Sequence, residues 1–368
     1  MDGRATLLLR WYRRHRRDLP WRRTRDPYAI WISEIMLQQT QVAKVVPYFE
    51  RFMERFPTVD ALAAAPIDDV LAVWTGLGYY RRARFLHRAA TVLLDEGRGM
   101  PKSAEELQKL PGIGAYTAAA VASIAFGESV PVMDGNVERV ICRLLALAED
   151  PKRSVIRRQL VAEAAKLLDD GAPGDSNQAL MELGATICRP RSPKCLLCPL
   201  SEACLGRQEP ENYPRPKKKR AIEEVKLDIA LVRRPGTNGT STLFFRRPEN
   251  AELMAGLWEL PTVEAMPGRS PASVLGRRYG GEWRLGEEVA RVAHGITYRS
   301  IIAVVYAAEV EARGGVASGP EAAWVDRGTI DQYAMSSLVA KVLSAVPDGN
   351  DPGEGGSAED SPEVPVNG

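Results

Sequence analysis

The sequence is poor in the side chains that most often bind catalytic metals or form crosslinks. Its 368 residues include three histidines, His15, His87 and His294, and five cysteines. It contains no run of 18 or more apolar residues, so we expect no membrane-spanning segment. The apolar part of the N-terminal segment is too short for a secretory signal peptide. We therefore expect a cytoplasmic protein in a reducing compartment, where disulfides are disfavoured.

A change in residue pattern after residue 206 predicts two domains. Up to about residue 205, apolar residues recur three and four positions apart, which is typical of helices. Further on, "EVKLDIALV" alternates apolar and polar residues, which is a strand period, and "STLFFRR" and "SIIAVVYAAEV" are interpreted as strands too. We predict an all-α domain over 1–206 and an α/β domain over 222–346 that ends in the helix "SSLVAKVLSAV".

Two segments have compositions that suit connections and ends. Residues 207–221 are rich in proline and charge, and we predict a linker there. Residues 347–368 carry six acidic residues and no Lys or Arg, with many Gly and Pro, and we predict a disordered acidic tail.

Positive charge is concentrated near the N-terminus. Residues 1–25 contain nine arginines and two acidic residues, beside Trp11, Tyr12 and Trp21. Such a surface could face phosphate groups. A solvated amphipathic helix explains the charge equally well, so both interpretations stay open.

Four cysteines lie close together in "CRPRSPKCLLCPLSEAC", with the spacing C-x6-C-x2-C-x5-C. Structural zinc sites usually combine two close C-x2-C pairs, whereas this segment has one. Four thiols in one short segment with no histidine within reach fit a [4Fe–4S] cluster better. Zinc and unligated thiols stay as alternatives. The four candidate ligands are Cys188, Cys195, Cys198 and Cys204.

A glycine-containing turn connects two predicted helices. In "LPGIGAY", Gly112 and Gly114 allow a tight turn before a helix that begins near Ala115. Such a turn presents backbone N–H groups at a helix N-terminus, where they suit one DNA phosphate. A plain helix–helix turn is the alternative.

Glu34 interrupts an apolar helical surface in "YAIWISEIMLQQTQV". Its burial among neighbours three and four positions away would raise its pKa, so that it could hold a proton near neutral pH. A partner for one of the many arginines, or simple exposure, is the alternative. These neighbours are Ile30, Trp31, Leu37 and Gln38.

Asp134 in "PVMDGNVERV" is the second candidate carboxylate. An aspartate just before a helix is commonly only an N-cap. Two carboxyl groups, one protonated and one ionised, are nevertheless what cleavage of a glycosidic bond through an oxocarbenium-like state requires. The sequence alone leaves both interpretations open.

Taken together, the hairpin, the downstream aspartate and the cysteine spacing resemble the endonuclease III superfamily of DNA glycosylases. Within it, "WISEIMLQQTQV", "LPGIGAYTA" and "VMDGNVERV" resemble the MutY family of adenine-specific mismatch glycosylases. The similarity covers nearly all of 8–205, and "LMAGLWELP" (253–261) resembles the family's Nudix-like C-terminal domain. The resemblance implies an all-α helix–hairpin–helix domain with a [4Fe–4S] loop at 188–204, followed by an α/β Nudix-like domain.

The resemblance also implies roles for individual residues. Glu34 would protonate adenine at N7, and Asp134 would stabilise the oxocarbenium ion, with Tyr116 and Asn136 holding the site. The remaining positions would contact DNA, which must present a flipped adenine. Pocket residues would be Trp21 and Arg22, wedge residues Gln39 and Tyr79, phosphate-binding residues Gly112 and Gly114, and 8-oxoguanine-reading residues Thr297 and Tyr298.

Three departures from the wider pattern refine the prediction. Tyr116 stands where bifunctional members of the superfamily have a lysine, so we expect a monofunctional enzyme. No R-E-x-x-E-E run follows "GLWELP", so we expect no Nudix hydrolysis. The loop that often has Phe-Ser-His has Ile296, Thr297 and Tyr298, so the family's intercalating aromatic is absent while two hydrogen-bonding side chains remain for the lesion.

The resulting hypothesis is a monomeric, nucleoid-associated glycosylase of base excision repair. It would remove adenine paired with 8-oxoguanine or guanine in double-stranded DNA. The alternatives are a bifunctional pyrimidine glycosylase/lyase of the same superfamily and a non-catalytic DNA-binding module with a redox cluster.

Overall fold

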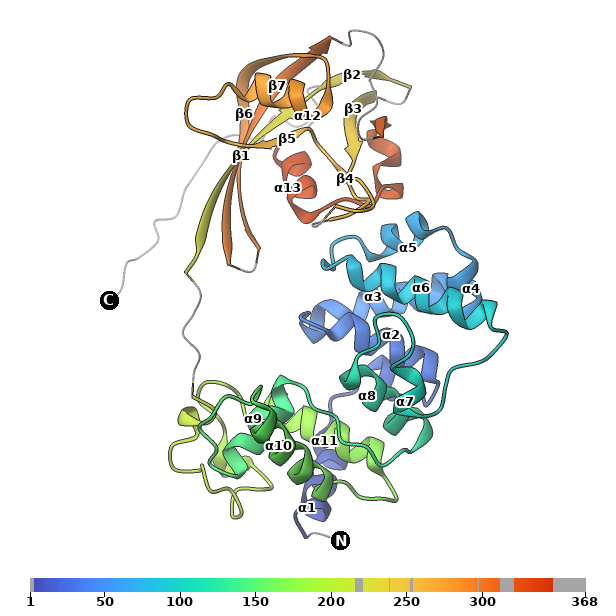
Figure 1. The fold of residues 1–368 in the computed structure, drawn as a ribbon, viewed down its shortest axis with the longest axis vertical. Helices are drawn as coiled ribbons and strands as arrows, with labels where there is room; N and C mark the ends of the chain where they lie inside the picture. The colour runs from blue at the N-terminus through green and yellow to red at the C-terminus, as the bar shows by residue number, and fades with distance from the viewer. Residues whose placement is uncertain are drawn as a thin grey trace, which may run out of the picture. The chain divides into compact units, whose positions relative to one another are not determined.

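The computed structural model describes residues 3–215, 221–237, 239–251, 254–296, 298–311 and 321–346 (Figure 1). The chain forms two compact units. The first contains the chain up to Ala221 together with two later segments, Glu249–Leu257 and Asp331–Ser336. The second contains Ile222–Pro248, Trp258–Ile330 and the chain from Ser337 on. The assignment of two later segments to the helical unit was not predicted from the sequence.

One half of the first unit packs around α2 and α8. Both helices are almost entirely buried, and the small side chains of α8 allow α2 to lie against it. Trp31, Phe52 and Trp74 are among the largest fully buried side chains of this core. Its helices are α2 (Pro27–Leu37), α3 (Val42–Arg55), α4 (Val59–Ala64), α5 (Ile67–Trp74), α6 (Arg81–Asp95), α7 (Ala104–Leu107) and α8 (Ala115–Phe126).

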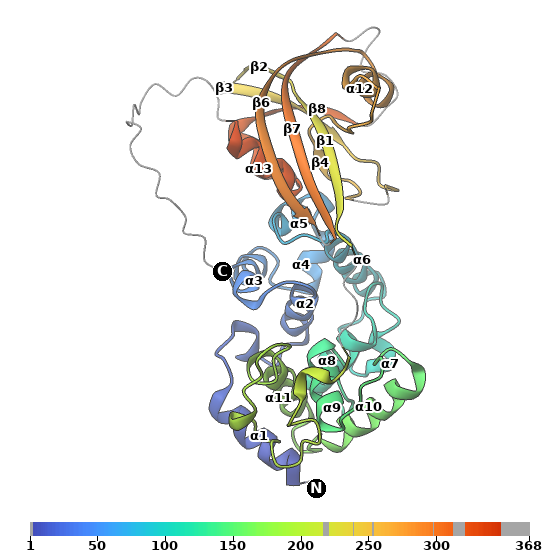
Figure 2. The ribbon, with the colours of Figure 1, turned by 90° about the vertical axis from the view of Figure 1, so that its left-hand side faces the viewer.

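The other half of the first unit has a core of its own. Leu8, Val137 and Leu183 come from three different helices and are fully buried together. The N-terminal helix packs against α11, far away in the sequence, as Figure 2 shows. The helices are α1 (Gly3–His15), α9 (Gly135–Leu144), α10 (Ser154–Lys166) and α11 (Pro173–Thr186), with short 3-10 turns η1 (Pro20–Arg22), η2 (Cys195–Leu197) and η3 (Pro210–Asn212).

The second unit consists of two small sheets and two helices. One sheet has the order β5-β1-β7-β6, and in the other β3 pairs with β2, β4 and β8. The central pair β1 and β7 is parallel, with Ile229 opposite Val305. The elements are β1 (Glu223–Leu231), β2 (Arg233–Gly236), β3 (Gly239–Arg246), β4 (Trp258–Glu259), β5 (Thr262–Glu264), α12 (Pro271–Tyr279), β6 (Glu282–Ile296), β7 (Arg299–Glu311), β8 (Ala322–Asp326), η4 (Arg327–Gln332) and α13 (Ser337–Ala345).

The predicted strands and the last helix correspond to β1, β3, β7 and α13, so these predictions are confirmed. The alternation in β1 holds only in its first half, because the second half is a central strand buried on both faces. The long strand β6 was missed, because its burial pattern is irregular and its register against β7 shifts between Leu285 and Ala290. The predicted acidic tail and part of the predicted linker, 216–220, lie outside the described residues.

Within the described part of the chain, no helix combines the length and the hydropathy needed to cross a bilayer. This finding agrees with the absence of a long apolar run in the sequence.

Candidate active site

Glu34 lies in the middle of α2, in the core of the first unit. Asp26 caps the start of this helix by accepting hydrogen bonds from the N–H groups of Tyr28 (3.1 Å) and Ala29 (3.4 Å). Most of its neighbours on α2 are apolar, and Glu34 itself is only 5% exposed. Burial raises its pKa from 4.5 to about 7, although the hydroxyl of Tyr116 opposes the shift. A carboxyl group with this pKa holds a proton over a large part of the neutral range.

Tyr116 reaches Glu34 from the first turn of α8. Its hydroxyl donates a hydrogen bond to Oε2 of Glu34 over 2.5 Å. Burial and the neighbouring carboxylates raise the pKa of Tyr116 well above its usual value, so the phenol stays neutral. The close packing of α2 against α8 sets this contact.

Asp134 is the N-cap of α9, so the commonplace interpretation of this residue is correct. Its Oδ1 accepts from the N–H of Val137 (2.7 Å), and its Oδ2 accepts from Nδ2 of Asn136 (2.9 Å). Burial raises the pKa of Asp134, and these hydrogen bonds oppose the shift. Capping leaves the carboxylate at the edge of the same cavity as Glu34, so the two roles are compatible.

A cavity of about 180 Å³ brings the predicted residues together. It lies between the two halves of the first unit, with Glu34 from one half and Asp134 from the other. All six residues predicted for the chemistry and the base pocket line it, namely Trp21, Arg22, Glu34, Tyr116, Asp134 and Asn136.

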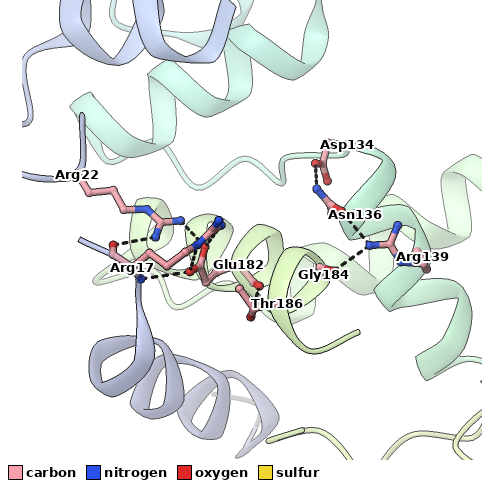
Figure 3. A network of polar contacts seen from close by, with 8 residues as sticks. All are labelled: Arg17, Arg22, Asp134, Asn136, Arg139, Glu182, Gly184 and Thr186. Carbon is pink, nitrogen blue, oxygen red and sulfur yellow. Dashed lines mark hydrogen bonds and ion pairs between the residues drawn. The ribbon is translucent and has the colours of Figure 1, made fainter. Parts of the chain in front are cut away.

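Glu182 on α11 lines the same cavity and was missed in the sequence. Its side chain is fully buried and accepts hydrogen bonds from Arg17 (2.8 and 2.7 Å) and from Arg22 (2.8 Å), as Figure 3 shows. Burial alone would raise its pKa, but the two arginines outweigh burial and lower the pKa to about 2. Its neighbours on α11 include the polar Gln178 and Thr186, so the apolar surroundings that indicated burial of Glu34 are absent from the sequence around Glu182.

Asn136 connects Asp134 to the cysteine segment through Arg139. Nη2 of Arg139 donates to Oδ1 of Asn136 (2.8 Å) and to the carbonyl of Gly184 (2.9 Å; Figure 3), while its Nε donates to the carbonyl of Cys188 (2.8 Å). Helices α9 and α11 lie so close at this point that a Cβ atom at position 184 would lie only 2.6 Å from Cβ of Asn136. The orientation of Asp134 thus depends on Asn136, which Arg139 holds in turn.

The four clustered cysteines are free thiols around one small cavity of about 30 Å³. The buried Arg143 crosses the segment by donating to the carbonyls of Arg189 (2.7 Å) and Pro190 (3.0 Å) and to Sγ of Cys188 (3.4 Å). In the described residues, which include all four cysteines, no group of three or more His, Cys, Asp or Glu side chains is arranged to hold a metal ion.

Comparison with known proteins assigns both units. Residues 32–165 match the HhH-GPD superfamily of base excision DNA repair proteins, and residues 229–345 match the NUDIX domain. The adenine DNA glycosylase of Homo sapiens is 36% identical over 94% of this chain and 74% of its own length. The chain belongs to the adenine DNA glycosylase family. It is therefore an enzyme of base excision repair that hydrolyses an N-glycosyl bond, and the predicted two-domain fold class is confirmed.

The chain is also similar to two further proteins, of which the first belongs to the same family. The adenine DNA glycosylase of Mycolicibacterium smegmatis is 49% identical over 53% of this chain and 66% of its own length. A solved structure of a thermostable thymine-DNA glycosylase is 32% identical, covers 56% of this chain and 95% of its own, and superposes with a TM-score of 0.52.

Gln39 and Tyr79, the two wedge candidates, do not line the cavity that contains Glu34 and Asp134. They line a separate hollow of about 330 Å³ together with Gly112 of the hairpin. Both are exposed, and both have left-handed backbones, with φ of 57° and 50°. Gly112 has φ 76° and leaves no room for a Cβ atom, which would lie 2.4 Å from Cβ of Phe85.

Gly114 differs from what the turn predicted. It is the N-cap of α8 with φ −85°, which any residue can adopt, so the turn itself does not need a glycine here. A Cβ atom at this position would meet nothing within 4 Å. Gly114 and Ala115, at the start of α8, are exposed.

The lesion-reading candidates lie in the second unit at the turn between β6 and β7. Thr297 lies outside the described residues. Tyr298 is half-buried, with the Arg299 guanidinium 5.8 Å from its ring centroid, and its carbonyl accepts from the N–H of Glu223 (2.8 Å).

The N-terminal arginines divide into two groups. Five of them form ion pairs within the first unit, whereas Arg10, Arg13, Arg14 and Arg16 are exposed. The interpretation of the aromatics as part of a phosphate-facing surface is wrong, because they belong to the core. The exposed fraction is 9% for Trp11, 0% for Tyr12 and 6% for Trp21. α1 is thus an amphipathic helix with a basic outer face.

Proposed function

We propose that this chain is a monofunctional glycosylase that removes adenine paired with 8-oxoguanine or guanine in duplex DNA. The observation that carries the proposal is one cavity that contains a proton-holding carboxyl, Glu34, and a hydrogen-bonded carboxylate, Asp134. Glycosidic cleavage needs this division between an acid and a charge-stabilising group.

In the proposed reaction, protonated Glu34 donates its proton to N7 of the flipped adenine. The neutral base is then a better leaving group, and the bond to the sugar breaks with positive charge developing on the sugar. Asp134 stabilises this charge, held by Val137 and Asn136. Water completes hydrolysis and leaves an abasic site.

Tyr116 supports the monofunctional assignment. Lyase chemistry at this position requires an amine that forms a Schiff base with the sugar. Tyr116 is a neutral phenol that is hydrogen-bonded to Glu34, and a phenol cannot form a Schiff base. We therefore expect an abasic product with an intact DNA backbone.

Flipping would use the hairpin and the two exposed wedge candidates. The exposed N-terminus of α8 at Gly114 and Ala115 suits a phosphate group of the DNA. Gln39 and Tyr79 would fill the space that the extracted base leaves, and a mispaired base costs less to extract. In the second unit, Tyr298 and the hydroxyl of Thr297 would supply hydrogen bonds to 8-oxoguanine.

The four cysteines fit a [4Fe–4S] cluster better than a single zinc ion. The thiols surround a common cavity whose lining contains no histidine, which suits ligation of a cluster by four thiolates. When bound, the cluster would crosslink the segment, and Arg139 and Arg143 tie that segment to α9.

Single-turnover excision tests the proposal. Duplexes with adenine opposite 8-oxoguanine, guanine or thymine are incubated with the wild type and with Asp134→Asn, which can still cap α9. We expect excision of mispaired adenine by the wild type and a loss of at least about a hundredfold in Asp134→Asn. Intact adenine in every duplex would refute the proposal, and efficient borohydride trapping on abasic DNA would favour the bifunctional alternative.

Two properties are expected from the substrate. Duplex DNA should be the only macromolecule needed for the reaction in vitro. In the cell we expect a monomer associated with the nucleoid.

A further inference from the structure

Arg82, in the first turn of α6, joins two segments that are distant in the sequence. Its Nη1 donates to the carbonyls of Ile35 (2.8 Å), Met36 (2.9 Å) and Gln38 (2.5 Å). Its Nη2 donates to Oγ1 of Thr40 (3.2 Å) and to the carbonyl of Gly78 (3.1 Å). The first four partners surround the end of α2, and the last precedes Tyr79.

Each of the two segments contains one wedge candidate with an unfavourable backbone. Gln39 has φ 57° and lies between Gln38 and Thr40, two partners of Arg82. Tyr79 has φ 50° and follows Gly78, a third partner. Left-handed backbones at non-glycine residues persist only where the surrounding structure holds them. Arg82 supplies hydrogen bonds on both sides of one of these residues and directly before the other.

The guanidinium also lies near aromatic rings. It stands 5.4 Å from the ring centroid of Trp74, which is fully buried, and 5.6 Å from that of Tyr79. The arginine therefore contacts the wedge ring itself as well as the backbone that carries it.

Arg82 is a half-buried cation, and partial loss of its hydration is costly. Burial lowers the pKa of Arg82 to about 10. In the part of the chain that the structure describes, its Nε is a buried nitrogen with no hydrogen-bond partner. The free carbonyl groups at the end of a helix are usually satisfied by a C-terminal glycine motif or by water. A planar fork that reaches five acceptors in two segments is specific to arginine, and a lysine cannot reproduce it.

We propose that Arg82 is a positioning residue that holds Gln39 and Tyr79 together in the geometry needed to extract a base from the duplex. The proposal rests on the proposed function, because it assumes that this enzyme flips adenine. Without Arg82 the two segments relax independently toward ordinary backbone conformations. The Glu34 cavity and its chemistry stay intact, so the defect appears only when a stacked, paired base has to be extracted.

The test compares Arg82→Lys with the wild type and with Arg88→Gln, an exposed position on the same helix. Single-turnover excision is measured with adenine opposite 8-oxoguanine and with adenine opposite an abasic analogue, where it has no pairing partner. We expect Arg82→Lys to be slower by about a hundredfold on the paired duplex and by about twofold on the unpaired one, where extraction costs less. Arg88→Gln should match the wild type on both.

Two further readouts separate positioning from a general structural role. The pH at which the rate falls should be the same in Arg82→Lys and the wild type, since Glu34 is unchanged. In a double-mutant cycle, Tyr79→Ala should add little to the loss in Arg82→Lys, because both act through the same wedge. Equal losses on the two duplexes, or additive losses in the cycle, would overturn the proposal.

A folding defect in Arg82→Lys would be recognised by its circular dichroism and thermal melting. In that case Thr40→Val, which removes one acceptor of Arg82, takes its place and should give a smaller loss that is again confined to the paired duplex. Because Thr40 also lines the Glu34 cavity, an unchanged pH midpoint is required as the check that this cavity is undisturbed. A uniform loss, or none, would overturn the proposal. If the wild type leaves adenine in place on both duplexes, the proposed function fails, which is a different result from failure of Arg82.

Discussion

Glu34 and Glu182 line the same cavity from α2 and α11, and both are buried, with exposed fractions of 5% and 0%. Their partners differ. Glu34 accepts from the neutral hydroxyl of Tyr116, and its pKa is raised to about 7. Glu182 accepts from Arg17 and Arg22, and its pKa is lowered to about 2.

The difference shows that burial alone does not decide the protonation of a carboxyl group. Desolvation raises the pKa of both glutamates, and only two guanidinium groups reverse the shift at Glu182. One cavity therefore contains a proton donor, Glu34, and an ionised carboxylate, Glu182, which is paired with two arginines. Each prediction below breaks or sharpens this contrast.

The largest expected effect is the loss of the proton donor. Glu34→Gln keeps the shape of the side chain but cannot donate a carboxyl proton, so excision of adenine should slow by about 10³-fold. Binding to a mispaired duplex should stay within a few-fold of the wild type, measured by fluorescence anisotropy. A rate within tenfold of the wild type would show that Glu34 is not the acid.

The second effect is the pH dependence of the rate. Above pH 7 Glu34 loses its proton, so the single-turnover rate should fall about tenfold per pH unit. Glu182 is ionised throughout this pH range, so its titration should not affect the rate. Glu182→Gln should therefore keep the same pH midpoint as the wild type. A profile that is flat up to pH 9 would contradict the raised pKa of Glu34.

The third effect is on stability. Glu182→Gln leaves Arg17 and the buried Arg22 without their carboxylate, which should cost about 2–3 kcal/mol at pH 7. Because its folded-state pKa lies below 4.5, this contribution is present above pH 4.5 and is lost as the pH falls toward 2. Urea unfolding at pH 7, 4 and 3 should show the gap between variant and wild type narrowing.

Glu34→Gln should show the opposite sign. The folded-state pKa of Glu34 lies above 4.5, so the wild type loses stability as the pH rises from 4.5 to 7. The variant should match the wild type at pH 4 and exceed it at pH 8 in the same urea experiment. Parallel curves for the two variants would mean that the two carboxyl groups do not differ as described.

The smallest effect concerns Tyr116. Its hydroxyl donates to the carboxylate of Glu34 and favours the ionised form. Tyr116→Phe should therefore raise the pKa of Glu34 and move the alkaline fall in rate upward by about one pH unit. A downward move would show that the hydroxyl stabilises the protonated acid instead.

Glu34 was accessible to sequence reasoning because its neighbours in α2 are apolar, so its helix alone indicates burial. Glu182 was not singled out, because its neighbours include Gln178 and Thr186 and its arginine partners lie 160 or more positions away. Charge patterns likewise failed for Trp11 and Tyr12, which point into a core formed with α9 to α11. What depends on one helix could be predicted from the residues themselves, whereas the meeting of Glu34 and Asp134 in one cavity was expected only from the family resemblance.

Gly184 gives the site a practical consequence for protein engineering. Alanine is more stable than glycine in a helix by about 1 kcal/mol, so replacing helical glycines is a common way to raise melting temperatures. At position 184 the added methyl group would lie 2.6 Å from Cβ of Asn136, the residue that orients Asp134. A stabilised version of this enzyme should therefore retain this glycine, because the methyl group that would stabilise the helix would also displace Asn136 and with it Asp134.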